Sequence, residues 1–219
     1  MPTAPHTAAE YWDRYLPAHD PNAPAPQPEF EWTQYGGHGP GAELLGAPRR
    51  ALDLGPAQGK EAVFLARQGV KVTGVDLSHV QVERARSWWN AEPNVHFVQA
   101  DACDFLRRDE SVYDAVYSVW GALWFTDPDE LLPLIFGRLD RGGVLAFSQA
   151  MPAASVYGPQ AMGGKHLEQA ELTVLRWQYP PHTWADLLKR HGFTQVEAYV
   201  LDAPDDGKAG TLMVSAVRA

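Results

Sequence analysis

The sequence predicts one α/β domain built around a mostly parallel sheet. Three observations support this prediction: five short apolar runs bounded by Gly, Asp or Pro, amphipathic segments between those runs, and a length of 219 residues. Such runs are typical of strands buried on both faces, and their alternation with helices predicts a parallel sheet with helices on both faces. The length suits a single well-buried core.

The five predicted strands and the helices between them follow one another from residue 49 to residue 150. The strands are Ala51–Leu54, Val70–Val75, Val95–Gln99, Tyr113–Ser118 and Gly143–Ser148. The helices are Lys60–Gln68, Val80–Asn90, Cys103–Arg108 and Asp129–Leu139. Ser78 or Asp76 can cap the second helix, and Asp127 can begin the fourth.

The C-terminal part predicts one more helix and two more strands. The helix His182–His191 ends before Gly192, and the strand-like runs Val196–Leu201 and Thr211–Val217 follow it. Because only a short loop joins these two runs, they should pair antiparallel. The prediction is therefore a seven-stranded sheet, mostly parallel, with an antiparallel C-terminal strand.

Composition and charge argue against several classes of protein. The formal net charge is −9, and the basic residues come as isolated pairs, which disfavours a nucleic acid or an anionic membrane surface as partner. No apolar run is long enough for a membrane span, and the N-terminus does not resemble a signal peptide. The single Cys103 excludes an internal disulfide. We expect a cytoplasmic protein.

The strongest motif is the turn after the first strand. Asp53 ends the strand, and Gly55, Ala57 and Gly59 lead into a helix, so backbone N–H groups can approach a ligand closely. A phosphate-binding loop of the form GxxxxGK[ST] does not fit, because the two glycines are too close and Glu61 follows Lys60. A dinucleotide fingerprint GxGxxG fits weakly, since only GxxxG is present.

Two further acidic residues follow the next strands in register. Asp76 ends the second strand about twenty residues on, where a carboxylate can accept both ribose hydroxyls of an adenosine. The structural alternative is that Asp76 only caps the next helix. Asp101 ends the third strand, and Cys103 beside it is expected to be a small buried thiol.

These motifs together resemble the class I S-adenosylmethionine-dependent methyltransferases. Asp53, Gly55 and Gly59 match the family's [DE]xGxGxG motif, and Ala57 stands where the family usually has its central Gly. Tyr113–Phe125 and Leu139–Leu145 resemble the fourth-strand motif and the turn into the fifth strand, with Arg141 replacing the usual Pro. The resemblance covers residues 49–148 and implies a Rossmann-like fold.

The resemblance also implies S-adenosylmethionine as cofactor and S-adenosylhomocysteine as product. Asp53 would meet the ammonium group, Asp76 the ribose and Asp101 the adenine amino group. The full set of residues expected to bind the cofactor is Asp53, Gly55, Ala57, Gly59, Asp76, Leu77, Asp101, Ala102 and Ser118.

Two segments outside the alternation are expected to enclose the methyl acceptor. Residues 1–48, with a short helix and a Pro-rich and aromatic stretch, should close the active site of the domain formed by residues 49–219. Residues 151–181 should form a lid hinged on glycines. The expected acceptor residues are Tyr11, Tyr35, Trp120, Trp124 and Gln149. The alternative is that these aromatics only pack the N-terminal segment onto the core.

The predicted function is O- or N-methylation of a small, neutral or hydrophobic acceptor by a monomer or homodimer. His38 and His166 are the candidate bases, because imidazole titrates near neutral pH. No HExxH, HxxxH or HxH pattern occurs, so no metal is expected. Two alternatives stay open: a catalytically silent cofactor-binding or interaction protein, and an NAD-type oxidoreductase.

Overall fold

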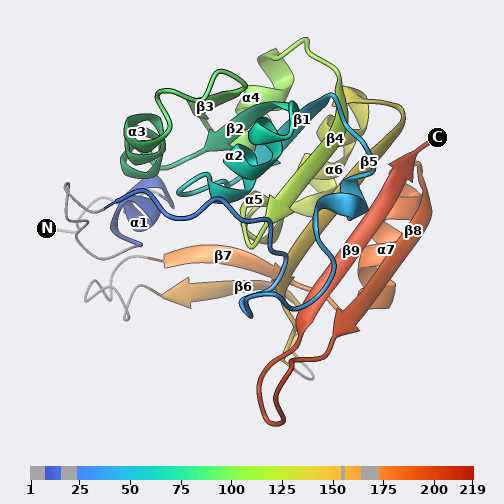
Figure 1. The fold of residues 1–219 in the computed structure, drawn as a ribbon. Coiled ribbons are helices and arrows are strands. Elements are labelled where there is room, and N and C mark those ends of the chain that lie inside the picture. Colours follow the sequence, from blue (N-terminus) through green and yellow to red (C-terminus); the bar gives the residue numbers. More distant parts are fainter. Residues whose placement is uncertain (1–7, 16–23, 154–155, 164–172) are drawn as a thin grey trace, which may run out of the picture.

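A seven-stranded sheet forms the centre of the molecule (Figure 1). The computed structural model describes residues 8–15, 24–153, 156–163 and 173–219. The strands of this sheet are β1 (Arg50–Leu54), β2 (Lys71–Asp76), β3 (Val95–Gln99), β4 (Tyr113–Val119), β5 (Leu139–Ala150), β8 (Phe193–Leu201) and β9 (Thr211–Arg218). Their order across the sheet is β3-β2-β1-β4-β5-β9-β8. The first five are parallel, and β9 pairs antiparallel with both β5 and β8. The predicted Rossmann-like fold is confirmed.

Helices cover both faces of this sheet. They are α2 (Lys60–Arg67), α3 (His79–Trp88), α4 (Ala102–Arg108), α5 (Ala122–Phe125), α6 (Pro128–Arg138) and α7 (Pro181–Arg190), with α1 (Ala8–Arg14) and the 3₁₀ helix η1 (Ala42–Leu45) before them. Successive strand residues point to opposite faces, so Ala51 of β1 enters one core with α2 and α3, whereas Leu52 enters the other with α4, α6 and α7. None of the described helices is long and apolar enough to cross a membrane.

The N-terminal segment before β1 contributes to one of these cores. Phe30, Trp32 and Leu45 are buried in the cluster that contains α2 and α3, and the Trp32 indole donates a hydrogen bond to the carbonyl of Gly41 (2.8 Å). The helix α1 lies beside α3 (Figure 1). Residues 24–48 therefore belong to the packed domain. The buried aromatic residues of this segment pack it onto the core, as the alternative to acceptor binding predicted.

The elements that the sequence did not predict are short or lie in the expected lid. The helix α5 has four residues, too few to show helical periodicity. Within residues 151–181, β6 (Gly158–Gly163) and β7 (Thr173–Gln178) pair as an antiparallel two-stranded sheet that contacts α1 and α5. The other elements begin or end within a few residues of the prediction, except that β5 begins at Leu139 and β8 at Phe193.

Candidate functional site

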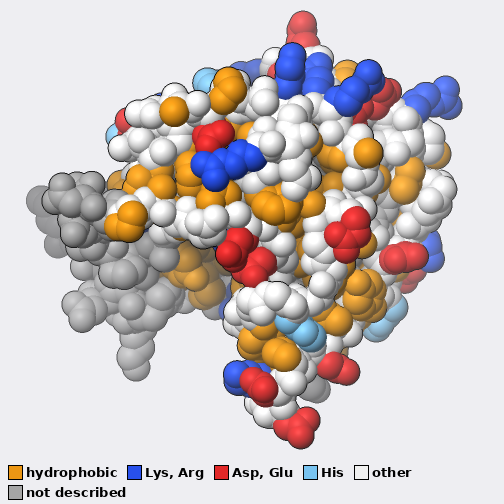
Figure 2. Space-filling model, in the orientation of Figure 1, with side chains coloured by type: hydrophobic (Ala, Val, Ile, Leu, Met, Phe, Trp, Pro, Cys, Tyr) orange, Lys and Arg blue, Asp and Glu red, His pale blue; other side chains and the backbone are white. Residues whose placement is uncertain are grey.

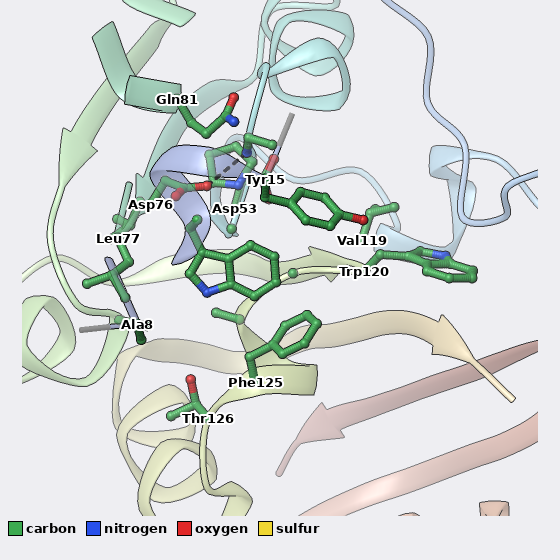
Figure 3. A pocket seen from close by; sticks show the side chains of 18 of the residues that line it. Ala8, Tyr15, Asp53, Asp76, Leu77, Gln81, Val119, Trp120, Phe125 and Thr126 are labelled. Carbon is green, nitrogen blue, oxygen red and sulfur yellow. Dashed lines mark hydrogen bonds between the residues drawn. The ribbon is translucent and has the colours of Figure 1, made fainter. Parts of the chain in front are cut away.

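A cavity of about 640 Å³ opens where the parallel strands end (Figure 3). Its walls come from the loops that follow β1, β2, β3 and β4, from α1 and the segment 31–34, and from β7 of the lid hairpin. In open parallel sheets, ligands bind outside the carboxyl ends of the strands. The volume lies within the range of small-molecule sites.

The turn after β1 approaches the loop after β4 so closely that it requires glycine. Gly55 has φ +89, and its N–H donates to the carbonyl of Val75 (2.9 Å). A Cβ on Gly55 would lie 2.7 Å from the backbone N of Ala122. Gly59 has φ +76, and a Cβ there would lie 2.4 Å from the ring of Phe97. Gly55 lines the cavity. Gly59 does not line the cavity but permits the close turn behind it.

Ala57 adopts the left-handed conformation that the family's usual glycine would favour. Its φ is +44, which disfavours a residue with a Cβ by about 1 kcal/mol. The backbone N–H of Ala57 donates to Oδ2 of Asp76 (3.0 Å), so the β1–α2 turn is tied to the end of β2. Ala57 lines the cavity in this conformation.

Asp76 is partly buried at the cavity wall and is not the cap of α3. That cap is Ser78, whose hydroxyl accepts from the N–H of Gln81 (3.1 Å). The Asp76 oxygens accept from the N–H groups of Ala57 and Ser78 (2.9 Å for Ser78). Burial raises the pKa of Asp76, and these two hydrogen bonds act in the opposite direction. Because each carboxylate oxygen can accept a second hydrogen bond, Asp76 can still receive ligand hydroxyls.

A second group of carboxylates lies deeper in the same wall. Asp53 is 2% exposed, and burial raises its pKa well above the usual range, with the nearby charge of Glu61 adding to the effect. Burial also raises the pKa of Glu61 to about 7. Lys60 Nζ lies 3.4 Å from Glu61 and 3.3 Å from Glu31. No sequence motif assigned Lys60 and Glu61 to this site, since in sequence they only rule out a phosphate-binding loop.

The remaining predicted cofactor residues divide between the cavity wall and its support. Leu77, Asp101 and Ala102 line the cavity. The Asp101 side chain also accepts from the N–H of Asp104 (3.0 Å), so it caps α4. Ser118 is fully buried behind the wall, where its hydroxyl donates to the carbonyl of Leu54 (2.7 Å). Ser118 therefore holds β4 against the end of β1.

Of the five predicted acceptor residues, the structure brings Trp120 to the cavity wall. Tyr11 of α1 is fully buried in a cluster with Val174 of β7, and Trp124 is buried against Phe125. The Tyr35 hydroxyl donates to the carbonyl of Ala209 (2.8 Å), and the buried Gln149 amide donates to the carbonyl of Trp177 (3.4 Å). The aromatic side chains that do line the cavity are Trp12, Tyr15, Trp120, Phe125 and Trp177.

Of the two predicted bases, the one that the structure describes, His38, does not line the cavity. His38 Nε2 lies 2.8 Å from the backbone oxygen of Asp202, outside the lining residues. His166 lies outside the described residues. The titratable groups of the described wall are carboxylates, Tyr15 and Lys60.

A glycine turn, two buried carboxylates and a cavity at the ends of parallel strands define a cofactor-binding α/β domain. Residues 52–147 match the family described as "Methyltransferase domain". The chain therefore carries a class I S-adenosylmethionine-dependent methyltransferase domain.

Relatives and solved structures agree with this assignment. A trans-aconitate 2-methyltransferase of Methylobacterium radiotolerans is 37% identical over 49% of this chain and 42% of the relative. The tRNA 5-carboxymethoxyuridine methyltransferase of Escherichia coli is 30% identical over 48% and 41%. The chain thus matches less than half the length of each of these curated relatives. A Burkholderia thailandensis 1,6-didemethyltoxoflavin-N1-methyltransferase, solved with S-adenosylhomocysteine, shares the fold with a TM-score of 0.58, 24% identity and coverage of 81% and 74%.

Proposed function

We propose that this chain binds S-adenosylmethionine in the cavity and transfers its methyl group to an O or N atom of a small molecule. The observation that carries the proposal is Asp76, a partly buried carboxylate that borders the cavity and is tied to the glycine turn through Ala57 (3.0 Å). The separate cap Ser78 leaves Asp76 available for a ligand.

The chemistry of the wall suits each part of this cofactor. Buried carboxylates at Asp53 and Glu61 suit an ammonium group, and Asp76 suits a pair of ribose hydroxyls. The buried Gln81 side chain adds a carbonyl oxygen that has no partner among the described residues and lines the cavity. Asp101 stands where an adenine amino group could donate to it. When bound, the cofactor supplies an already activated methyl group.

The chain's own contribution is then alignment and the exclusion of water. The glycine turn and Asp76 fix the cofactor, while Trp120, Phe125 and the lid strand β7 bound the space beyond it. Holding two reactants in line supplies much of the rate enhancement of such a displacement. Within the described part of the wall, carboxylates are the side chains placed to receive a proton from the acceptor, and His166 stays a predicted base.

A small molecule suits the cavity better than a nucleic acid does. Lys60 is the one cation among the described lining residues, and its ammonium already has two carboxylate neighbours. On the face shown in Figure 2, Lys and Arg side chains gather at the top of the view among acidic side chains. Affinity for nucleic acid depends on phosphate contacts from Lys and Arg. The cytoplasmic location and the monomer or homodimer stay predictions.

The test is a turnover assay that detects S-adenosylhomocysteine release over a panel of small hydroxyl and amine compounds. Release that depends on both cofactor and acceptor, and that Asp76→Asn diminishes, is expected. Tight cofactor binding without turnover on any acceptor would instead favour the silent binding protein. Release with transfer RNA alone would reject the small-molecule acceptor.

A further inference from the structure

The backbone at Trp120 is strained at the point where β4 enters the cavity. Its φ is +52, in the left-handed region that bulky side chains rarely adopt. Three contacts hold it there: the backbone N–H donates to the carbonyl of Ser148 (2.9 Å), the indole donates to the carbonyl of Trp32 (3.1 Å), and the ring packs edge-on against Trp124 (5.5 Å). Strain that the surroundings enforce is concentrated at ligand-binding and catalytic positions.

Trp120 lies at the opposite side of the cavity from the predicted ribose site. Figure 3 shows Asp76 and Leu77 at one side and Val119 and Trp120 at the other, with Tyr15 and Phe125 bordering the space between them. Trp120 thus borders the cavity on the side away from the predicted ribose site. Aromatic walls of this kind favour flat ligands, because rings stack or pack edge-on.

The ionisable side chains that line the cavity are almost all acidic. The carboxylates are Glu31, Asp53, Glu61, Asp76, Asp101, Asp127 and Glu130. Among the described lining residues Lys60 is the one cation, and it lies between Glu31 and Glu61. Within the described part of the wall, an anionic acceptor would therefore find no cation without a carboxylate neighbour and would meet acidic side chains, which opposes binding.

We infer that the methyl acceptor is a planar aromatic compound that is neutral or cationic where it enters the cavity. The inference rests on the proposed function and specifies its acceptor. Trp120 is the binding surface for the ring, and the Glu31–Lys60–Glu61 group excludes carboxylates and phosphates.

The test compares probes that share a ring and differ in charge. Calorimetry on the protein saturated with S-adenosylhomocysteine measures tryptamine, indole and indole-3-acetate, and then 1-naphthylmethylamine against 1-naphthaleneacetate. We expect the neutral and cationic probes to bind at least about tenfold more tightly than the anion of the same ring. Equal or tighter binding of the anions, or no binding of any probe, overturns the inference.

Two substitutions separate the contribution of the ring from that of the charge. Trp120→Leu should reduce the affinity for indole severalfold, and Trp120→Phe should restore most of it because the ring is retained. In the wild-type protein, Glu31 accepts a hydrogen bond from the N–H of Gly37 (3.0 Å). Glu31→Gln keeps an oxygen that can accept this hydrogen bond but removes one negatively charged neighbour of Lys60. It should strengthen indole-3-acetate binding severalfold relative to indole binding.

The control for the proposed function is the S-adenosylhomocysteine titration itself. Absence of cofactor binding in the wild-type protein would reject the proposed function before any acceptor is added. Cofactor binding together with a preference for anionic probes, or with an affinity for indole that Trp120→Leu does not change, would reject the acceptor inference alone.

Discussion

Gly55→Ala tests whether the β1–α2 turn and the β4–α5 loop form one tightly packed wall. The matched control is Gly69→Ala at the other end of α2. Both glycines have similar φ values, +89 and +91, so both substitutions introduce left-handed strain. They differ in space, because a Cβ at Gly55 meets the backbone of Gly121 and Ala122 at 2.8 and 2.7 Å, whereas nothing lies within 4 Å of a Cβ at Gly69.

The expected magnitudes follow from these contacts. Left-handed strain alone destabilises by about 1 kcal/mol, which is the whole effect expected for Gly69→Ala. Forcing a methyl group against backbone adds about 1–3 kcal/mol at Gly55, because backbone cannot rotate away. Gly55→Ala should therefore lower the free energy of unfolding by about 2–4 kcal/mol.

Urea denaturation measures both changes, and calorimetry measures the effect on the cavity. Because Gly55, Gly121 and Ala122 all line the cavity, Gly55→Ala should also weaken S-adenosylhomocysteine binding by about tenfold or more. Gly69→Ala should leave that affinity unchanged. Equal destabilisation by the two substitutions would show that the close approach at Gly55 does not contribute to the fold.

Three further predictions concern single carboxylates. Asp76→Asn should weaken S-adenosylhomocysteine binding by about 1–3 kcal/mol, which is the scale of a hydrogen bond to a charged acceptor. Calorimetry measures this change. An unchanged affinity would show that Asp76 has only a structural role. The folded-state pKa of Glu61, about 7, lies above its ordinary value of 4.5, so the folded protein holds a proton that the unfolded chain releases. The free energy of unfolding should therefore fall by about 3 kcal/mol as pH rises from 4.5 to above 7. This pH dependence should weaken in Glu61→Gln. The same pH dependence in the wild-type protein and in Glu61→Gln would contradict the prediction. The Asp13 carboxylate accepts hydrogen bonds from the Ser78 hydroxyl (2.6 Å) and the Val80 N–H (3.2 Å). Asp13→Ala should therefore speed both amide hydrogen exchange in residues 8–15 and the release of S-adenosylhomocysteine. Unaltered exchange would show that this contact does not hold α1 in place.

The sequence predicted the sheet and the loops that border the cavity because those features depend on local pattern. Asp76 and Asp101 follow strands that are evident from their apolar runs, and parallel strands place such ends at one edge. The turn at Gly55 likewise depends on a few consecutive residues. These positions follow from chain order once the topology is known.

The parts that could not be predicted depend on how distant segments pack. Lys60 lies beside Glu31, 29 residues earlier, only because Trp32 anchors the N-terminal segment in the core. Trp120 and Trp124 look equivalent in the sequence, but Trp120, which has a left-handed backbone, lines the cavity, whereas Trp124 is buried. Tyr11 and Trp12 are neighbours on α1, and the docking of that helix against α3 decides which one lines the cavity.

Calorimetric titration with S-adenosylhomocysteine and, separately, with NAD distinguishes a methyltransferase cofactor site from a dinucleotide site. We expect saturable binding of S-adenosylhomocysteine with one site per chain, weakened in Asp76→Asn, and no comparable binding of NAD. Micromolar binding of NAD with no response to S-adenosylhomocysteine would contradict the assignment of this cavity.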